Sequence, residues 1–423
     1  MTRVASLAPP SPTGLQLALR RTVEPAVALT RYRPQPELGP PTPEQQAHLA
    51  LARRLDVGPL PAVRKTGSSL GGLIDALGFR VMRRFFSGTH RAELEACDYY
   101  EMEGGWLERS ESAHLDPQRY FPQPGPPDVE VSTRGRLDGG VVEDLSFSSA
   151  DYADRPTARQ TLRRYPSNGT AHLRCYRHDD HGRPAVLWLH GWGMGFFGVE
   201  ALVCRARWLY SLGLDVYLYM QPYHAWRRPA GVTFAGEVFP TTHMTRTNEG
   251  LLQAVWEIRA AMAWHRARGG GPCGVVGLSL GGYLAAVLAS VAPELAFAVP
   301  LLPVADIPTL MWSNGEGTAE RRWAEESGVT FEMFCRSMAV HAPLAHKLLI
   351  PTENVMLIGA MGDRVIPPLH TEALWEHWDQ PQIHWMPGSH LVHFGRRGYL
   401  EHLAVFLSRR FPGLSEGKGW TKG

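Results

Sequence analysis

The stretch CGVVGLSLGGYLAAVLASVA, residues 273–292, decides the fold. It begins as an apolar run, reaches Ser279 inside the motif GLSLG at 277–281, and continues as an alanine-rich run. The motif matches G-x-S-x-G, in which a serine occupies a strained turn between a strand and a helix. Glycines two positions before and after the serine allow the strand and the helix to pack tightly around it. The stretch therefore predicts a strand, a sharp turn that presents Ser279, and a helix whose N-terminus faces the site.

Runs typical of strands and of helices alternate on both sides of that stretch. The strand-like runs are short and mostly apolar, and they lie within 170–178, 184–191, 215–222, 296–303, 353–363 and 382–390. The helix-like runs carry apolar residues at helical spacing, and they cover 248–268 and 400–411. Such alternation is typical of a parallel sheet covered by helices on both faces. We therefore expect an α/β fold with a mostly parallel central sheet.

The chain of 423 residues is long enough for two or three domains, and its composition changes along its length. Residues 1–65 are rich in proline, arginine and small polar residues, which bury little apolar surface, so we expect an irregular arm there. We expect residues 66–137 to form a helical extension and a linker, because PQPGPP stands at 122–127. The regular α/β domain is expected at 138–412, and residues 413–423 are expected to form a tail.

Residues 70–87, LGGLIDALGFRVMRRFFS, carry apolar residues at helical spacing with arginines between them. Two interpretations are open. Such a helix packs on the main domain, or it lies on a membrane surface with its arginines at the lipid headgroups. The sequence has no run of about 18 apolar residues, so we expect no transmembrane span.

Charge and cysteine content exclude several classes of partner. Lysine plus arginine number 43 and aspartate plus glutamate 41, so the net charge of +2 gives no reason to expect a nucleic-acid partner. The five cysteines are scattered and form no CxxC pair, which argues against a disulfide framework or a zinc site. Because the start lacks a signal-peptide pattern as well, we expect a cytoplasmic protein. The run HDDH at 178–181 lies in a polar turn and is expected to be solvated, so we expect no metal and no cofactor.

A second glycine-rich motif, HGWGMG at 190–195, follows the apolar run AVLWL. Glycines after such a strand let the backbone turn sharply enough to aim an N–H group into a site. We expect the amides of Trp192 and Leu280 to form an oxyanion hole, with the Gly193 amide as the alternative to that of Trp192. His190 is expected to hold the loop through hydrogen bonds.

Two aspartates are candidates for the acid that would orient a catalytic histidine. Asp363 follows the run VMLIG, stands directly after Gly362 and precedes Pro367, which is typical of a carboxylate loop at the edge of a sheet. Asp306 follows the run AFAVPLLP without those flanks and is the competing candidate. We expect Asp363 to be the acid.

Three histidines near the end of the chain are candidates for the base. His390 stands at the tip of the loop behind the last strand-like run, whereas His384 lies inside that run and His393 lies beyond the loop. We expect His390 to be the base. The chain order is then Ser279, Asp363 and His390, in which the histidine takes the proton of the serine and the aspartate orients the histidine.

These motifs, in this order, resemble the α/β-hydrolase superfamily over about residues 138–412. QPYHAWRRP at 221–229, GLSLGG at 277–282 and GSHLVHF at 388–394 resemble the subgroup of alpha/beta hydrolase domain-containing protein eighteen. The resemblance implies the α/β-hydrolase fold and a serine nucleophile. The long N-terminal arm and the HGWGMG loop depart from that subgroup, and no substrate follows from the resemblance.

The motifs predict a serine hydrolase that cleaves a carboxylic ester or thioester through an acyl-enzyme on Ser279. A peptidase or acyltransferase with the same three residues is an alternative, and so is a hydrolase-fold protein that binds without catalysis. Dehalogenases and epoxide hydrolases of this fold do not fit, because they need an aspartate where Ser279 stands.

Two further features bear on the substrate. The segment 307–350 is expected to form either a cap over the site or a pair of ordinary surface helices. Its aromatic residues, together with Trp192, Phe196, Phe197 and Trp226, either line an apolar acyl pocket or fill the core. We expect a small acyl substrate that is partly apolar.

The motif QPYHAWRRP contains two adjacent arginines, Arg227 and Arg228. We expect a solvated surface pair. The alternative is a site for an anionic group of a substrate.

Overall fold

A computed structural model of the chain describes residues 39–56, Asp75 and residues 120–414, the last range without 155, 242–243, 318, 327–328 and 394–395. The helix predicted at 70–87, apart from Asp75, lies outside the described residues, as does most of the predicted arm, extension and tail. In the described part, no helix is both long and apolar enough to cross a membrane.

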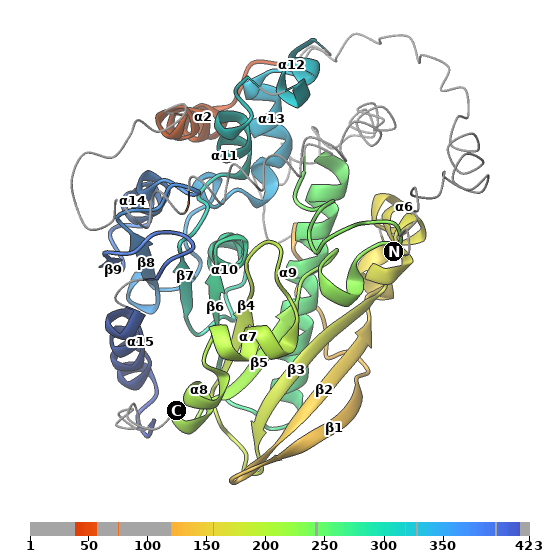
Figure 1. Cartoon of the computed structure of the whole chain (residues 1–423), viewed down its shortest axis with the longest axis vertical. Coiled ribbons are helices and arrows are strands. Elements are labelled where there is room, and N and C mark those ends of the chain that lie inside the picture. Colours follow the sequence, from red (N-terminus) through yellow and green to blue (C-terminus); the bar gives the residue numbers. More distant parts are fainter. Residues whose placement is uncertain are drawn as a thin grey trace, which may run out of the picture. The chain divides into compact units, whose positions relative to one another are not determined.

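In the part of the chain that the structure describes, nine strands form one sheet in the order β1-β2-β3-β5-β4-β6-β7-β8-β9 (Figure 1). Strands β4 to β9 run parallel to one another, and β1, β2 and β3 pair antiparallel with their neighbours. The prediction of a mostly parallel sheet is confirmed. The strands are β1 (Glu130–Leu137), β2 (Gly140–Ser148), β3 (Thr170–His178), β4 (Ala185–Leu189), β5 (Asp215–Met220), β6 (Cys273–Leu278), β7 (Ala298–Leu301), β8 (Met356–Ala360) and β9 (Gln382–Met386).

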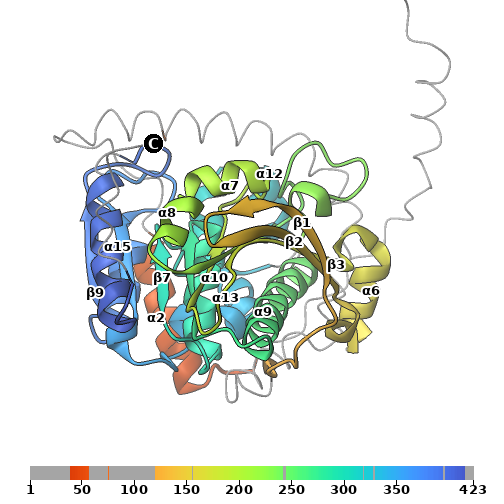
Figure 2. The ribbon, with the colours of Figure 1, turned by 90° about the horizontal axis from the view of Figure 1, so that it is seen from below.

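Helices cover both faces of this sheet, with α7 and α8 on one side of the strands and α9 and α10 on the other (Figure 2). The α-helices are α2 (Pro43–Leu55), α6 (Pro156–Arg164), α7 (Phe197–Val203), α8 (Ala206–Ser211), α9 (Met244–Ala267), α10 (Leu280–Val291), α11 (Ile307–Asn314), α12 (Ala319–Glu326), α13 (Phe331–Met338), α14 (Pro368–His377) and α15 (Arg396–Arg410). Short 3-10 helices are η2 (Ala150–Asp154), η3 (Pro166–Asn168), η4 (Ala225–Arg227), η5 (Ala339–His341), η6 (Pro343–Ala345) and η7 (Thr352–Asn354).

Two large cores in the described part of the chain follow from the alternation of side chains along each strand. In β4, Leu187 and Leu189 belong to the core that contains residues of α9, α10 and α14. Val186 and Trp188 point to the other face, into the core that contains residues of α7, α8 and α15. A strand that is covered on both faces must be apolar throughout, which is why AVLWL reads as one continuous hydrophobic run.

The hairpin of β1 and β2 lies partly upstream of position 138, where the regular domain was expected to begin. Leu137 pairs with Gly140, so Asp138 and Gly139 form a two-residue turn, and Gly139 has a φ of 66°. Asp-Gly is a typical sequence for such a turn, because the left-handed conformation is accessible to glycine.

The prediction of an irregular arm over 1–65 is wrong at 43–55, where α2 forms. Thr42 and Gln45 make a capping box: the Gln45 amide donates to the Thr42 hydroxyl at 3.3 Å, and the Thr42 amide donates to Oε1 of Gln45 at 2.9 Å. Leu49 then packs with Phe331 of α13 in a small core of their own. The composition indicates an irregular arm, but the capping box and the buried apolar face of α2 stabilise a helix there.

The segment 307–350 forms three α-helices rather than a pair. Together with α2, they lie beyond the end of the sheet at which α10 begins (Figure 1). The ring of Trp312 lies 5.8 Å from that of Phe331 and 6.3 Å from that of Phe334, measured between centroids. These aromatic residues pack against one another. A role of the segment as a cap stays a prediction.

Candidate active site

Ser279 stands on the sharp turn that the glycine motif predicts. It joins β6 to α10 with φ 57° and ψ −111°, a backbone conformation that residues other than glycine rarely adopt. A Cβ atom at Gly277 would collide with the backbone of Gly281, and one at Gly281 would collide with the Leu189 carbonyl. Both glycines are therefore needed for the turn to close against β4.

Three residues from three loops form one hydrogen-bonded chain. Nε2 of His390 lies 3.0 Å from Oγ of Ser279, and Nδ1 of the same ring lies 2.7 Å from Oδ2 of Asp363. These loops follow β6, β8 and β9, whose carboxyl ends meet at one edge of the sheet. The structure thus brings together the three residues that the sequence predicts, and their catalytic role stays a prediction.

Asp363 is fixed by its own loop. Its Oδ1 accepts hydrogen bonds from the amides of Val365 at 2.9 Å and Ile366 at 2.7 Å, which leaves Oδ2 for His390. The exposed fraction of the side chain is 2% for Asp363 and 10% for His390, whereas Ser279 is partly exposed. The chain therefore runs from a buried carboxylate to a hydroxyl that solvent can reach.

The electrostatics of the site favour a histidine that accepts a proton. Burial lowers the pKa of His390, but the negative charge and the hydrogen bond of Asp363, together with the negative charge of Asp75, more than offset this effect. The pKa of His390 is raised above its ordinary value as a result. An imidazolium formed beside Ser279 would be stabilised in the same way.

The competing candidates lie elsewhere. Asp306 caps α11 through the Thr309 amide at 3.0 Å and pairs with His48 of α2. The ring of His384 lies tilted against that of His402 with centroids 4.3 Å apart, and His393 bonds to the carbonyl of His390 at 3.0 Å. None of these contacts involves the side chain of Ser279.

The HGWGMG loop lies beside the nucleophile, because a Cβ atom at Gly191 would lie 3.6 Å from that of Ser279. His190 holds the loop as expected. Its Nδ1 donates to the Gly191 carbonyl at 2.8 Å, and its Nε2 accepts from the Gln221 amide at 3.0 Å. Burial lowers the pKa of His190 to about 4, so this ring stays neutral.

Glu200, a carboxylate that was not predicted from the sequence, holds the same loop through a hydrogen bond. Glu200 of α7 accepts from the Gly195 amide and from the indole of Trp188, each at 2.8 Å. Trp192 is half-buried, and its indole donates to the Gly236 carbonyl at 2.8 Å. The assignment of the oxyanion donors to backbone amides stays a prediction.

The prediction of a solvated arginine pair is wrong for Arg227. Its guanidinium forms two hydrogen bonds of 2.7 Å with Glu257 of α9, and both side chains have an exposed fraction of 0%. The same guanidinium donates to the carbonyl of Met220 at 3.0 Å and to that of Asn168 at 2.9 Å. Arg227 therefore fixes the loop after β5, while Arg228 is exposed.

Asp75 is the other residue that the sequence analysis missed. Its buried carboxylate accepts a hydrogen bond of 2.7 Å from the His390 amide. A single aspartate in an apolar run gives no signal of such a contact across 315 positions.

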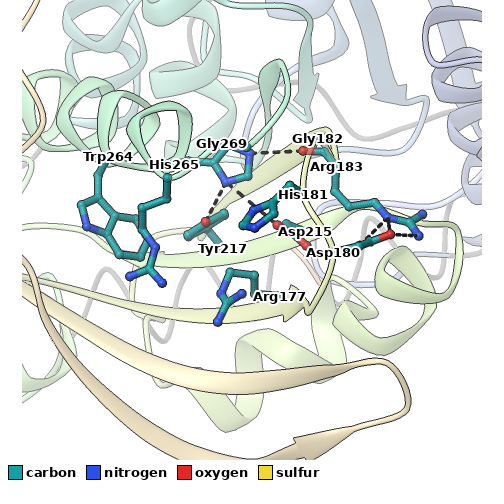
Figure 3. Close-up of a pocket in the computed structure, with 12 residues that line it drawn as sticks. Arg177, Asp180, His181, Gly182, Arg183, Asp215, Tyr217, Trp264, His265 and Gly269 are labelled. Carbon is teal, nitrogen blue, oxygen red and sulfur yellow. Dashed lines mark hydrogen bonds and ion pairs between the residues drawn. The ribbon is translucent and has the colours of Figure 1, made fainter.

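A small pocket of about 40 Å³ lies at the opposite end of the parallel strands, where β4, β5 and β6 begin (Figure 3). It is lined by Gly182, Asp215 and Gly269, which stand at or just before the starts of β4, β5 and β6. Inside it His265 lies between Tyr217 and the carbonyl of Arg183, at 2.8 and 3.2 Å. This pocket shares no residue with the chain of Ser279, His390 and Asp363.

The HDDH run borders that pocket, and its expected solvation is only partly right. Asp179, Asp180 and His181 are exposed, but His178 is partly buried. Its Nδ1 lies 2.9 Å from Oδ1 of Asp215, and its ring stacks on that of Tyr210. Among the described residues, no three side chains of the types that bind metals form a cluster.

Comparisons with known proteins agree with the family that the motifs indicate. The family model for alpha/beta hydrolase domain containing 18 matches residues 249–324, a range that includes Ser279. Uncharacterized protein MT2702 of Mycobacterium tuberculosis (strain CDC 1551) is 32% identical over 351 residues, which are 80% of this chain and 80% of the relative. Uncharacterized protein Rv2627c of strain H37Rv is 31% identical over 301 residues, which are 69% of this chain and 68% of the relative.

Solved structures that resemble the chain are more distant. Acetyl xylan esterase 1 from Thermoanaerobacterium sp. has a TM-score of 0.48 and 15% identity, with 72% of this chain and 94% of that one covered. An esterase from Pyrococcus furiosus has a TM-score of 0.38 and 11% identity, with 67% and 93% covered. The chain belongs to the same family as the two mycobacterial relatives and has the α/β-hydrolase fold, and the part of it around Ser279 is similar to the family of alpha/beta hydrolase domain containing 18.

Proposed function

We propose that the protein is a serine hydrolase that cleaves a carboxylic ester or thioester through an acyl-enzyme on Ser279. The observation that carries the proposal is the chain of hydrogen bonds of 3.0 and 2.7 Å from Ser279 through His390 to Asp363. A serine hydroxyl is a poor nucleophile by itself, and an adjacent base that is oriented by a carboxylate activates it.

The reaction proceeds in two stages. Oγ of Ser279 attacks the carbonyl carbon while Nε2 of His390 takes its proton, and Asp363 stabilises the imidazolium. The tetrahedral intermediate then collapses, the bond to the alcohol or thiol breaks, and His390 returns the proton to the leaving group. Water then attacks the acyl-enzyme while His390 takes its proton, and His390 returns that proton to Oγ of Ser279 as the bond between the acyl carbon and Oγ breaks and the acid leaves.

Backbone amides of Trp192 and Leu280 are proposed to hold the oxyanion. Leu280 is the first residue of α10, so its N–H has no acceptor within the helix. The loop of Trp192 lies against Ser279 at Gly191, and Gly193 is the alternative donor in that loop. One donor of this kind contributes about 2.7–4 kcal/mol to the stabilisation of the transition state.

A small, partly apolar acyl substrate fits these surroundings. The half-buried indole of Trp192 meets Phe234 edge to face, with 5.3 Å between ring centroids.

A cytoplasmic location is part of the proposal and is supported by Cys175, Cys204 and Cys273, which are buried free thiols. Contact of the 70–87 segment with a membrane surface stays a prediction.

A series of p-nitrophenyl esters, from acetate to palmitate, tests the proposal. We expect turnover with a preference for one range of chain lengths, and none above background for Ser279→Ala. Ser290→Ala is the matched control, because Ser290 lies in α10, the helix that follows Ser279, and its hydroxyl donates to the Ala286 carbonyl at 3.3 Å. A folded protein that hydrolyses no ester, thioester or amide would favour a protein that binds without catalysis. Faster turnover of amides would indicate a peptidase, and transfer to an added alcohol an acyltransferase.

A further inference from the structure

A third carboxylate contacts the loop that carries the base. Asp75 has an exposed fraction of 0%, and its Oδ2 accepts from the amide of His390 at 2.7 Å. Its Oδ1 accepts from the hydroxyl of Ser389 and from the amide of Leu391, each at 2.9 Å. Three consecutive residues of the loop are therefore held by one side chain.

The same carboxylate also reaches the loop of the acid. The amide of Arg364 donates to Oδ2 of Asp75 at 3.2 Å, and Arg364 directly follows Asp363. Asp75 thus joins the loop after β8 to the loop after β9, which carry the two ends of the 2.7 Å contact between Asp363 and His390. A carboxylate that accepts four hydrogen bonds in a buried place restricts both backbones.

The charge of Asp75 acts on the same histidine. Its four donors among the described residues are three backbone amides and a hydroxyl, which carry no charge. The groups that face His390 are Ser279, Asp363, Asp75 and His393, and the two carboxylates both raise the pKa of His390 against the effect of burial.

We propose that Asp75 is a positioning residue of this site: it holds the loop of His390 so that the ring spans Ser279 and Asp363, and its charge stabilises the imidazolium. The N-terminal region, which lies far upstream of the α/β domain, then supplies a part that the site needs. This inference rests on the proposed function.

Substitutions at Asp75, and one at a control residue, test the inference in the full-length protein. Asp75→Asn keeps the shape but removes the charge and places an N–H₂ group among donors, so the loop must shift. Because a misplacement of about 1 Å can cost ~100-fold, we expect kcat to fall by that order while KM changes little. Asp75→Glu keeps the charge. Asp56→Asn is the matched control, since Asp56 also comes from the N-terminal region and also accepts a serine hydroxyl, that of Ser313 at 2.7 Å.

The pH dependence separates positioning from a merely structural role. Loss of a negative charge lowers the pKa of His390, so the acid limb of kcat/KM should move to lower pH in Asp75→Asn. It should stay in place in Asp75→Glu and in Asp56→Asn. Wild-type kcat in folded Asp75→Asn, or a loss of kcat with an unmoved acid limb, would overturn the inference.

If Asp75→Asn does not fold, Ser389→Ala decides, because it deletes a side chain whose hydroxyl donates to Asp75. We expect a several-fold loss of kcat with a nearly unchanged Tm, and wild-type kcat would overturn the inference. The proposed function fails separately, when the wild-type protein itself reacts with no ester and no fluorophosphonate.

Discussion

His48 of α2 and Asp306 before α11 form a buried pair, in which Nε2 of the histidine lies 3.0 Å from Oδ1 of the aspartate. The other oxygen of Asp306 accepts from the amide of Thr309 at 3.0 Å and from its hydroxyl at 2.5 Å. All these partners serve the packing of helices. We predict that Asp306→Asn lowers the free energy of unfolding by about 1–3 kcal/mol and changes kcat by only a few fold. Thermal unfolding and ester turnover check the two parts.

Asp363→Asn should behave in the opposite way. The amide keeps the shape of the carboxylate but loses the charge that stabilises the imidazolium and fixes its tautomer. In a serine protease this change costs about 10⁴-fold in turnover, and we expect a loss of similar order with little change in Tm. Both variants are measured on one activated ester. A dead Asp306→Asn beside an active Asp363→Asn would reverse the assignment of the acid.

The dependence of kcat/KM on pH should report His390. The histidine must be unprotonated to take the serine proton, so activity is lost as pH falls through its pKa. Because Asp363 raises that pKa, the acid limb should lie above about 6.5, the ordinary value for histidine. An acid limb well below that value would mean that burial outweighs the carboxylate.

Ser279→Ala and His390→Ala should each abolish turnover, and the double variant should be little worse than either. The two residues act as one unit, so removing the second costs almost nothing once the first is gone. Single-turnover rates of the three variants measure this. Losses that add in full would show that the two residues work independently.

The buried pair of Arg227 and Glu257 gives a prediction about stability. Arg227→Met leaves the Glu257 carboxylate buried without its partner, which should cost about 3–5 kcal/mol of unfolding free energy. The double variant Arg227→Met with Glu257→Gln should recover part of that loss. Arg228→Met is the matched control and should change stability little, because that side chain is exposed. Denaturant unfolding measures all of these, and equal stability of Arg227→Met and Arg228→Met would contradict the role given to the pair.

The sequence predicts the parts of this protein whose signals are local. Strands such as β4 and β6 are covered on both faces, so they appear as continuous apolar runs, and the glycines around Ser279 mark the turn. The hairpin of β1 and β2 was missed because β1 is largely exposed and lacks an apolar run. Contacts between distant segments leave no such pattern. The pairing of Arg227 with Glu257 and the contact of Asp75 with the His390 loop appear only when the fold brings those residues together.

The most direct test of the central claim is a peptide map after reaction with a fluorophosphonate. We expect one adduct on the folded wild-type protein, on the peptide that contains Ser279. Ser279→Ala should carry none, and heat-unfolded protein should carry none, because the reaction needs the contact with His390 at 3.0 Å. A folded wild-type protein that stays unlabelled, or Ser279→Ala labelled to the same extent, would contradict the claim that Ser279 is the nucleophile.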